Sequence, residues 1–433
     1  MGVTGWLRRL AAAAPSPVFA VAGVDARDAV QDLHLVSDLR LVDAPRQASV
    51  LLLAGGMTDQ LLDAAVAAHD VMPTPRRVVR WQPSCAAIPP REPFADVELV
   101  VGADPVEAIL ALHRSLHLGE RTSTPSIQPD VDPAPWRGEG PYGQGGTGMT
   151  GGVPYGRPMA IREDDRDGLS LDALPVPVGP LFPAFPPGMS ARVTFKGDLV
   201  HRFEPGPIPY DDIKCEPNVF QRALSEPVAV VELEMARARA LLRWTARALR
   251  LQGLDALAQR VLTLARAVTP QDVARVQSVR RWVTHPLVTG RQLRGIGRLS
   301  ADSVAGLATG PVGRAAGVAD DAREEDPAYR ELGFTAVTGR VGDAAARWQQ
   351  RLSEAEQALE LAARAGALRT AGAGVVESPR GRLTTDSTPT ARLWPLVPEL
   401  VTGVEWGDAV AILTSLDLDL AELAMPRCDH GVG

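Results

Sequence analysis

Thiol and imidazole side chains are the first groups in this sequence that could bind a metal or carry redox chemistry. Cys85, Cys215 and Cys428 lie far apart and form no CxxC pair. Three such cysteines cannot supply the four thiolates of a typical iron–sulfur cluster. His113 and His117 have the i, i+4 spacing of two ligands on one helix face. No acid or cysteine completes that set, so we expect a surface histidine pair and predict no metal site.

Two further patterns that could bind a ligand fall in irregular sequence. GxGxxG matches occur at 138–143 and 146–151, but neither follows a strand or opens a helix. A nucleotide site needs that context, so these glycines are interpreted as part of a linker. Cys428, Asp429 and His430 are adjacent near the carboxyl end, where a flexible tail is expected. A regulatory binding module that uses the glycine-rich segment stays open as an alternative.

Composition narrows the class of protein. The chain has 433 residues and a formal net charge of -7, which gives no overall attraction to nucleic acid or anionic lipid. No apolar run approaches the roughly 18–20 residues that cross a bilayer, so any membrane association is expected through partner proteins. The start of the chain resembles a signal peptide, but Pro15 and Pro17 interrupt its apolar stretch.

The amino-terminal part alternates strands and helices. Short β-branched runs predict strands at 18–24, 50–53, 77–81 and 97–101, and apolar residues at helical spacing predict helices at 26–36, 59–69 and 105–116. This alternation predicts a doubly wound, flavodoxin-like α/β domain with a parallel sheet. Ligands of such a sheet bind beyond the carboxyl ends of the strands.

The rest of the chain is predicted to be mainly helical. Proline and glycine dominate 119–165, which is interpreted as a linker, and the runs 169–177 and 191–203 predict a small antiparallel sheet. Helices are expected at 228–249, 270–283, 343–365 and 406–416. Arg237 is placed on a solvated flank beside Glu232 and Glu234. The predicted domains are therefore 1–118, the linker 119–165, and 166–433.

The first domain resembles the small, cluster-bearing subunit of respiratory complex I, a family that includes small subunits of membrane hydrogenases. The segments 43–55, 72–76, 83–86 and 102–105 carry this resemblance. It implies four cysteines at the strand ends that hold an iron–sulfur cluster. Here Cys85 is the only remnant, the adjacent cysteine pair is replaced by about Gly23 and Val24, and the last ligand position is Ala103. The resemblance therefore implies a domain that holds no cluster by itself.

The second domain resembles the large, quinone-site subunit of complex I, the D subunit of NADH-quinone oxidoreductase, which is related to the large subunit of nickel-iron hydrogenases. The segments 178–200, 309–323, 342–354 and 406–417 carry the resemblance. The family's Gly-Pro-Gln-His-Pro presents a histidine to the quinone. This chain has Gly-Pro-Leu-Phe-Pro at 179–183 with Phe185 nearby, and Tyr210 is a weak substitute for the quinone-side tyrosine.

The motif residues of this second resemblance are charged. A turn between helices is expected to bring Arg314, Asp320 and Arg323 within hydrogen-bond reach of one another. The other motif residues are expected on the 343–365 helix. Because the quinone contacts are missing, we expect these groups to hold the fold or a subunit contact through buried, paired charges. The remaining candidates are Asp343, Arg347, Arg351 and Glu354.

Together these features predict a fused pseudo-enzyme without catalytic residues or cofactors of its own. It would be a structural subunit of a complex I-like or hydrogenase-like respiratory oxidoreductase, peripheral on the cytoplasmic inner face of the cell membrane through partner subunits. The alternative is an active NADH- or ferredoxin-quinone oxidoreductase subunit that shapes a quinone cavity while partner subunits supply the clusters.

Overall fold

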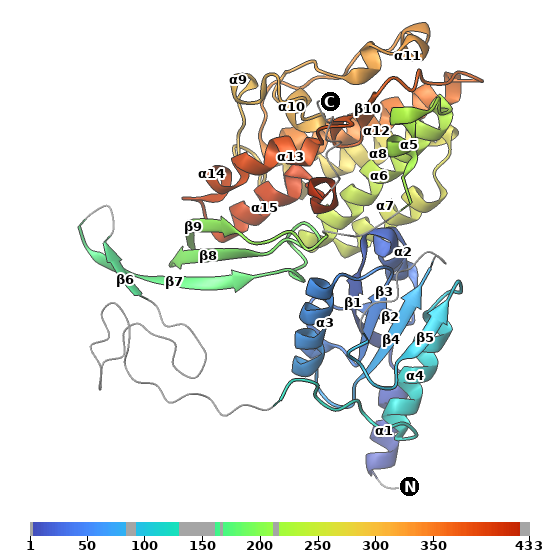
Figure 1. Ribbon diagram of the computed structural model, residues 1–433, viewed down its shortest axis with the longest axis vertical. Coiled ribbons are helices and arrows are strands. Elements are labelled where there is room, and N and C mark those ends of the chain that lie inside the picture. The colour runs from blue at the N-terminus through green and yellow to red at the C-terminus, as the bar shows by residue number, and fades with distance from the viewer. Residues whose placement is uncertain (1–2, 84–91, 130–160, 165–167, 211–215, 425–433) are drawn as a thin grey trace, which may run out of the picture. The chain divides into compact units, whose positions relative to one another are not determined.

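The chain folds into two compact units, drawn in Figure 1. The structure is a computed structural model that describes residues 3–83, 92–129, 161–164, 168–210 and 216–424. The first unit comprises 1–131 together with the short segments 180–183 and 209–216, and the second unit comprises the remainder. The domain boundaries expected from the sequence stay a prediction.

The first unit is built on a five-stranded parallel sheet with the order β2-β1-β3-β4-β5. This is the flavodoxin-like order, so the predicted α/β class is confirmed. The central strand β3 is buried along its whole length, as expected for a parallel sheet covered on both faces. The three-residue β2 was not predicted from the sequence. The strands are β1 (Ser16–Ala22), β2 (Leu39–Leu41), β3 (Val50–Ala54), β4 (Arg77–Gln82) and β5 (Glu98–Val101).

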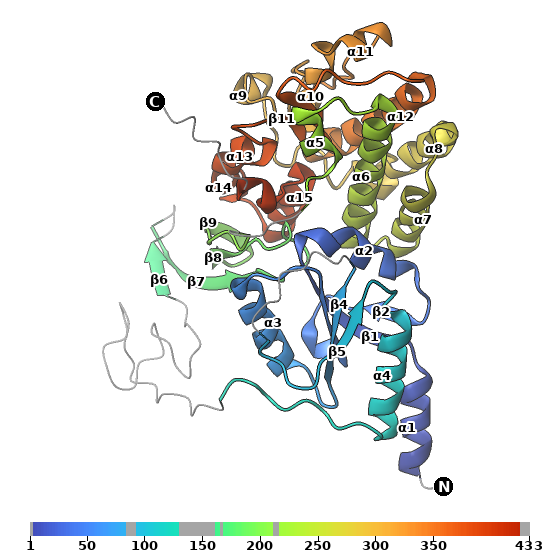
Figure 2. The same ribbon diagram turned by 45° about the vertical axis from the view of Figure 1, so that its right-hand side comes forward.

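Helices cover both faces of this sheet. α3 (Asp59–Val71) lies on one face, and α4 (Val106–Leu118) lies on the other with α1 (Val3–Ala13) beside it (Figures 1 and 2). Thr58 caps α3 by accepting from Leu61 N at 3.3 Å, and Gly119 ends α4 with a φ of +80°. The predicted 26–36 helix is a short α2 (Arg27–Asp32) between 3-10 turns η1 (Val24–Ala26) and η2 (Leu33–Leu35); η3 (Pro45–Gln47) precedes β3. Helix α1 was not predicted.

The second unit contains two small antiparallel sheets. The larger has the order β6-β7-β8-β9 and includes the predicted hairpin, whose turn places Gly197 at a φ of +63°. Its strands are β6 (Ile161–Asp164), β7 (Ser170–Val178), β8 (Ala191–Lys196) and β9 (Leu199–Pro205). β6 falls inside the segment that was interpreted as linker. The smaller sheet pairs β10 (Val375–Ser378) with β11 (Gly381–Thr384), which was not predicted.

Two long helices form the centre of the second unit. α6 (Val230–Leu251) packs against α12 (Ala344–Arg364), and the rings of Trp244 and Trp348 meet edge to face at 5.1 Å. The predicted final helix is confirmed as α15 (Trp406–Leu416). The other helices are α5 (Val219–Ser225), α7 (Asp255–Ala267), α8 (Val273–Val283), α9 (Ala301–Val304), α10 (Pro311–Ala315), α11 (Pro327–Glu331), α13 (Pro389–Leu393) and α14 (Val397–Val401), with 3-10 turns η5 (Pro270–Asp272), η7 (Ala322–Glu324), η8 (Trp394–Leu396) and η9 (Leu420–Leu423) and the π-helical turn η6 (Pro286–Gly290).

None of the helices in the described part of the chain combines the length and the hydropathy that a bilayer crossing requires.

Asp343 fixes the start of α12. Its Oδ1 accepts from Ala346 N at 2.8 Å, and its Oδ2 accepts from Gly295 N at 2.8 Å. We expect Asp343→Ala to lower the free energy of unfolding by about 1–2 kcal/mol, because two backbone donors lose their acceptor. Asp343→Asn keeps one acceptor oxygen and should cost less. Urea unfolding of both variants checks this, and an equal loss would show that capping is not the cause.

Candidate functional site

The first candidate site is the sheet edge where β1 and β3 end. The strand order reverses between these two neighbours, and parallel sheets bind ligands at such switch points. In this chain two hydrogen bonds lie at this edge: Gly23 N donates to Ala54 O at 2.8 Å, and Gly56 N donates to the side-chain Oδ1 of Asp25 at 2.9 Å. The turn after β3 is thereby held against the turn after β1.

No side chain fits at Gly23. A Cβ at this position would lie 2.0 Å from Gly56 O, far inside van der Waals contact. Gly55 adopts a φ of +74°, and a Cβ there would lie 2.3 Å from Asp25 Oδ1. The resemblance places the family's cysteine pair at about Gly23 and Val24. A thiolate at the first of these positions is incompatible with this turn, so the residues present do not fit an iron–sulfur cluster.

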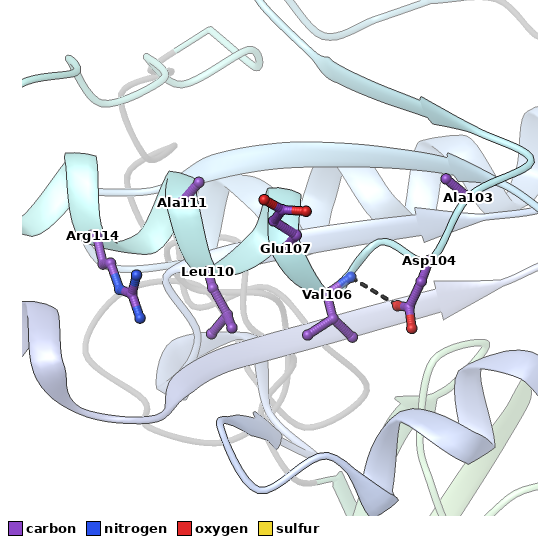
Figure 3. Close-up of a pocket in the computed structure, with 7 residues that line it drawn as sticks. All are labelled: Ala103, Asp104, Val106, Glu107, Leu110, Ala111 and Arg114. Atoms are coloured by element: carbon purple, nitrogen blue, oxygen red, sulfur yellow. Dashed lines mark hydrogen bonds between the residues drawn. The ribbon is translucent and has the colours of Figure 1, made fainter.

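Of the other two expected ligand positions, only Cys85 has a thiol. Cys85 lies outside the described residues. Ala103 contributes only a methyl group to an open hollow of about 610 Å³ along α4 (Figure 3). Its backbone oxygen accepts from Trp81 Nε1 at 2.8 Å, which ties the loop before α4 to β4. The hollow carries ordinary surface groups and is lined by Ala103, Asp104, Val106, Glu107, Leu110, Ala111 and Arg114.

The expectation that His113 and His117 form a pair on the surface is partly wrong. The rings of His113 and His117 are neighbours at 4.5 Å, but His113 is buried between Ser49 Oγ at 3.3 Å and Ala11 O at 3.1 Å. Burial, followed by the charge of His117, lowers the pKa of His113. In the described residues no three His, Cys, Asp or Glu side chains gather as a metal site would require. His113 therefore has a packing role between α4 and α1.

Apolar packing occupies the segment that resembles the quinone-side hairpin. Phe185 is buried, with ring centroids 6.1 Å from Phe203 and 5.8 Å from Trp406. Tyr210, which belongs to the first unit, is buried with the Arg27 guanidinium 4.8 Å above its ring. Cys215, the glycine-rich run and the Cys428 tail lie outside the described residues.

The second candidate site is a set of charged side chains inside the second unit, here called the buried ion cluster. Each of its seven members is 3% exposed or less. They come from α6, α10, the η7 region, α12 and β10, so distant parts of the sequence meet in it. The members are Glu234, Arg237, Arg314, Asp321, Arg323, Glu354 and Glu377.

Arg314 is the centre of the cluster. Its Nε and Nη2 bind the two carboxylate oxygens of Glu354 at 2.8 and 2.9 Å, a fork-to-fork pair. Its Nη1 contacts Glu377 Oε1 at 2.8 Å and Asp321 Oδ2 at 3.0 Å. One guanidinium group thus binds carboxylates from three separate segments.

Arg323 and Arg237 extend the cluster to α6. Arg323 binds both oxygens of Asp321, at 3.0 and 2.8 Å, and reaches Glu234 Oε2 at 3.2 Å. Glu234 also accepts from Tyr329 Oη at 2.5 Å and pairs with Arg237 Nε at 3.2 Å. The sequence interpretation of Arg237 and Glu234 as a solvated flank is wrong, because both are buried. Glu234 accepts from Arg323, and Arg237 Nη2 donates to Glu377 O at 2.6 Å.

The carboxylate that binds Arg314 and Arg323 belongs to Asp321 and not, as expected, to Asp320. Asp321 binds both guanidinium groups, whereas the Asp320 carboxylate pairs with Arg382 at 3.1 Å. Asp320 still contributes its backbone oxygen, which accepts from Arg314 Nη1 at 2.9 Å. Glu377 was missed because it lies far along the chain in a strand that the sequence did not predict.

Charge inside the cluster is unbalanced, since three guanidinium groups face four carboxylates. Burial opposes ionisation of Asp321 and Glu354, but the arginines outweigh it and hold both pKa values below their usual range. For Glu377 burial dominates, and the charge of Asp321 adds to it, so its pKa is raised to about 7. Glu377 is therefore the member whose proton occupancy changes near neutral pH.

Arg347 and Arg351 form a separate buried pair on α12. Arg347 donates to Gly297 O and Gly342 O, each at 2.8 Å, and to Ser415 Oγ at 2.9 Å. Arg351 donates to Ser415 O at 2.7 Å and lies 4.5 Å over the Trp244 ring. Burial, followed by the charge of Arg351, lowers the pKa of Arg347 to about 9. Both side chains tie the carboxyl end of α15 to α12.

Comparison with known proteins matches part of the second unit to one family. Residues 233–392 match the family model described as the 49 kDa subunit of respiratory-chain NADH dehydrogenase. This stretch is less than half of the chain, and it contains every member of the buried ion cluster. No curated protein matches the sequence. One similar solved chain belongs to the membrane-bound sulfane sulfur reductase, an archaeal respiratory membrane complex; it is 19% identical, the match covers 58% of this chain and 98% of that chain, and the TM-score is 0.42.

Gly23→Ala tests how tightly the switch point is closed. Because the added methyl group would meet Gly56 O, we expect a loss of about 2–3 kcal/mol in the free energy of unfolding. Gly56→Ala is the matched control in the same turn: its Cβ would meet no atom closer than 3.8 Å, and it should leave stability nearly unchanged. Equal effects in thermal or urea unfolding would refute the steric account.

Glu377→Gln and Glu354→Gln should change stability with pH in opposite directions. The pKa of Glu377 is about 7 in the folded chain against an ordinary 4.5. Between these two pH values folding takes up a proton, so the wild type loses stability as the pH rises from 4.5 to 7. Glu377→Gln should therefore gain on the wild type as pH rises, by at most about 3 kcal/mol.

The Glu354 variant supplies the control for this pH dependence. The pKa of Glu354 is lowered in the folded chain, so its ionised form stabilises above the ordinary carboxyl pKa and this contribution is lost as pH falls. Glu354→Gln should be strongly destabilising at neutral pH and less so in acid. Urea unfolding at several pH values measures both variants, and parallel pH profiles would contradict the assignment.

Proposed function

We propose that the chain is an architectural subunit of a complex I-like or hydrogenase-like, membrane-associated respiratory oxidoreductase. In this proposal residues 1–118 derive from a small cluster-bearing subunit, 119–165 form a linker, and 166–433 derive from the large quinone-site subunit. Partner subunits would carry the clusters and would hold the chain at the inner face of the cell membrane.

The observation that carries the proposal is the overlap between the family match and the buried ion cluster. Residues 233–392 match the 49 kDa subunit model, and all seven charged members lie in that range. Each of them pairs inside the protein, as with Arg314 and its three carboxylates. Charged groups that are fully used in mutual pairing support a role in holding the fold together.

The cost of breaking such a cluster explains why it would persist without catalysis. Removing one partner of a buried ion pair leaves an uncompensated charge and costs about 3–5 kcal/mol. Arg314 lies on α10 and by itself binds carboxylates of the η7 region, α12 and β10. A variant that lost it would lose the packing of the second unit, and with it the surfaces of that unit that a partner subunit could bind.

Two local features support a role outside electron transfer. Cluster-to-quinone chemistry needs an electron donor beside a protonatable acceptor site. The position of the expected cysteine pair has no space for a side chain, since a Cβ at Gly23 would lie 2.0 Å from Gly56 O. The expected histidine position is Phe182, and a phenyl ring donates no proton. The nearby Phe185 lies in an aromatic cluster.

Purification of the tagged chain from membranes tests the assembly. We expect membrane-embedded and cluster-bearing subunits to copurify after mild detergent extraction. Arg314→Met should remove the chain from this complex and reduce the complex itself, because three buried carboxylates lose their common partner. Purification of the chain without other subunits would contradict membership in an assembly.

Two further variants separate the architectural role from a catalytic one. Cys85→Ser and Tyr210→Phe remove the only candidate cluster ligand and the only candidate quinone-side phenol that the sequence indicated. Both should leave quinone reduction by the membranes, and the iron–sulfur signals of the complex, unchanged. A lower turnover number with an intact complex, for either variant, would favour an active subunit that shapes a quinone cavity.

A further inference from the structure

Helix α1 exposes an apolar stripe to solvent. Val3, Trp6, Leu7 and Leu10 are 74%, 62%, 50% and 57% exposed. Their spacing of three and four residues places them on one face of the helix. A continuous exposed face of large apolar side chains that includes a tryptophan is unusual on a soluble surface and marks an interaction site.

The last turn of α1 packs on the side away from the stripe, which orients the helix. Ala12 is buried, and Ala11 O accepts from His113 Nε2 of α4 at 3.1 Å. Figures 1 and 2 both show α1 lying along α4. The helix is thus already formed and oriented, so a ligand of the stripe would not have to fold it.

Charge around the stripe selects among possible partners. Arg8 and Arg9 are both exposed and follow Leu7 directly, and the first acidic residue of the chain is Asp25. This acid-free, basic start contrasts with the net charge of -7 of the whole chain. An apolar face with tryptophan and flanking arginines is the pattern of a helix that lies in the interface of an anionic bilayer.

We infer that α1 binds the surface of an anionic lipid bilayer directly. Trp6, Leu7 and Leu10 would enter the boundary between headgroups and acyl chains, while Arg9 contacts lipid phosphates. The inference goes beyond the proposed function, in which partner subunits provide the attachment, and it does not depend on the identity of the assembly.

Vesicle cosedimentation of the purified full-length chain tests this inference. We expect binding to phosphatidylcholine vesicles that contain phosphatidylglycerol, and weaker binding at high salt or without the anionic lipid. Leu7→Ser with Leu10→Ser should weaken binding by roughly tenfold or more, because two apolar side chains lose their burial in the interface. Arg9→Glu should weaken binding to the anionic vesicles only.

Leu99→Ser with Val101→Ser is the matched control. These side chains lie on β5 of the same unit and are 59% and 51% exposed, close to the values of Leu7 and Leu10, but acidic residues flank them. The control should bind vesicles like the wild type, and thermal unfolding should show that both double variants are folded. Absence of vesicle binding by the wild type, or an equal loss in the control, would overturn the inference. So would a change from dimer to monomer in the α1 variant, since a second copy would then be the occupant.

Discussion

Seven charged side chains buried in one place cost several kcal/mol each unless every charge finds partners with good geometry. The second unit meets this condition by making Arg314 a shared partner: Glu354, Asp321 and Glu377 all contact it. The arrangement of α10, α12 and β10 is therefore constrained by one planar guanidinium group. Hydrophobic packing, as between Trp244 and Trp348, fills the space around this constraint but would tolerate small shifts that the hydrogen bonds do not.

The first unit relies on a different constraint, the close approach of backbone to backbone. Gly23 and Gly55 let the turns after β1 and β3 touch, and the Asp25 carboxylate fastens them through Gly56 N. In this fold the same edge commonly binds a ligand. In both units, therefore, the residues that could have formed a ligand site make internal contacts instead. These residues are glycines in the first unit and charged side chains in the second. This shared use is the physical basis for proposing an architectural subunit.

Local patterns predicted most of the fold. The alternation of β-branched and helical runs indicated the parallel sheet, and the apolar stripes indicated α6, α12 and α15. Short elements such as β2 and β10 were missed because three or four residues carry too little periodicity. The motif around Arg314 and Glu354 was visible, but its partner proved to be Asp321, since one residue along a turn changes the direction of a side chain. Glu234 and Glu377 could not be found, because only tertiary packing brings them to the arginines.

The buried ion cluster also orders events during synthesis. Among the members of the cluster Glu234 is synthesised first and Glu377 last, and Arg314 is synthesised before all three of its carboxylate partners. Until β10 has left the ribosomal exit tunnel, the helices made earlier cannot pack over the arginines without burying a guanidinium group that lacks one of its carboxylate partners. Compaction of α6 and α10 around the arginines therefore depends on a strand that is made long after them.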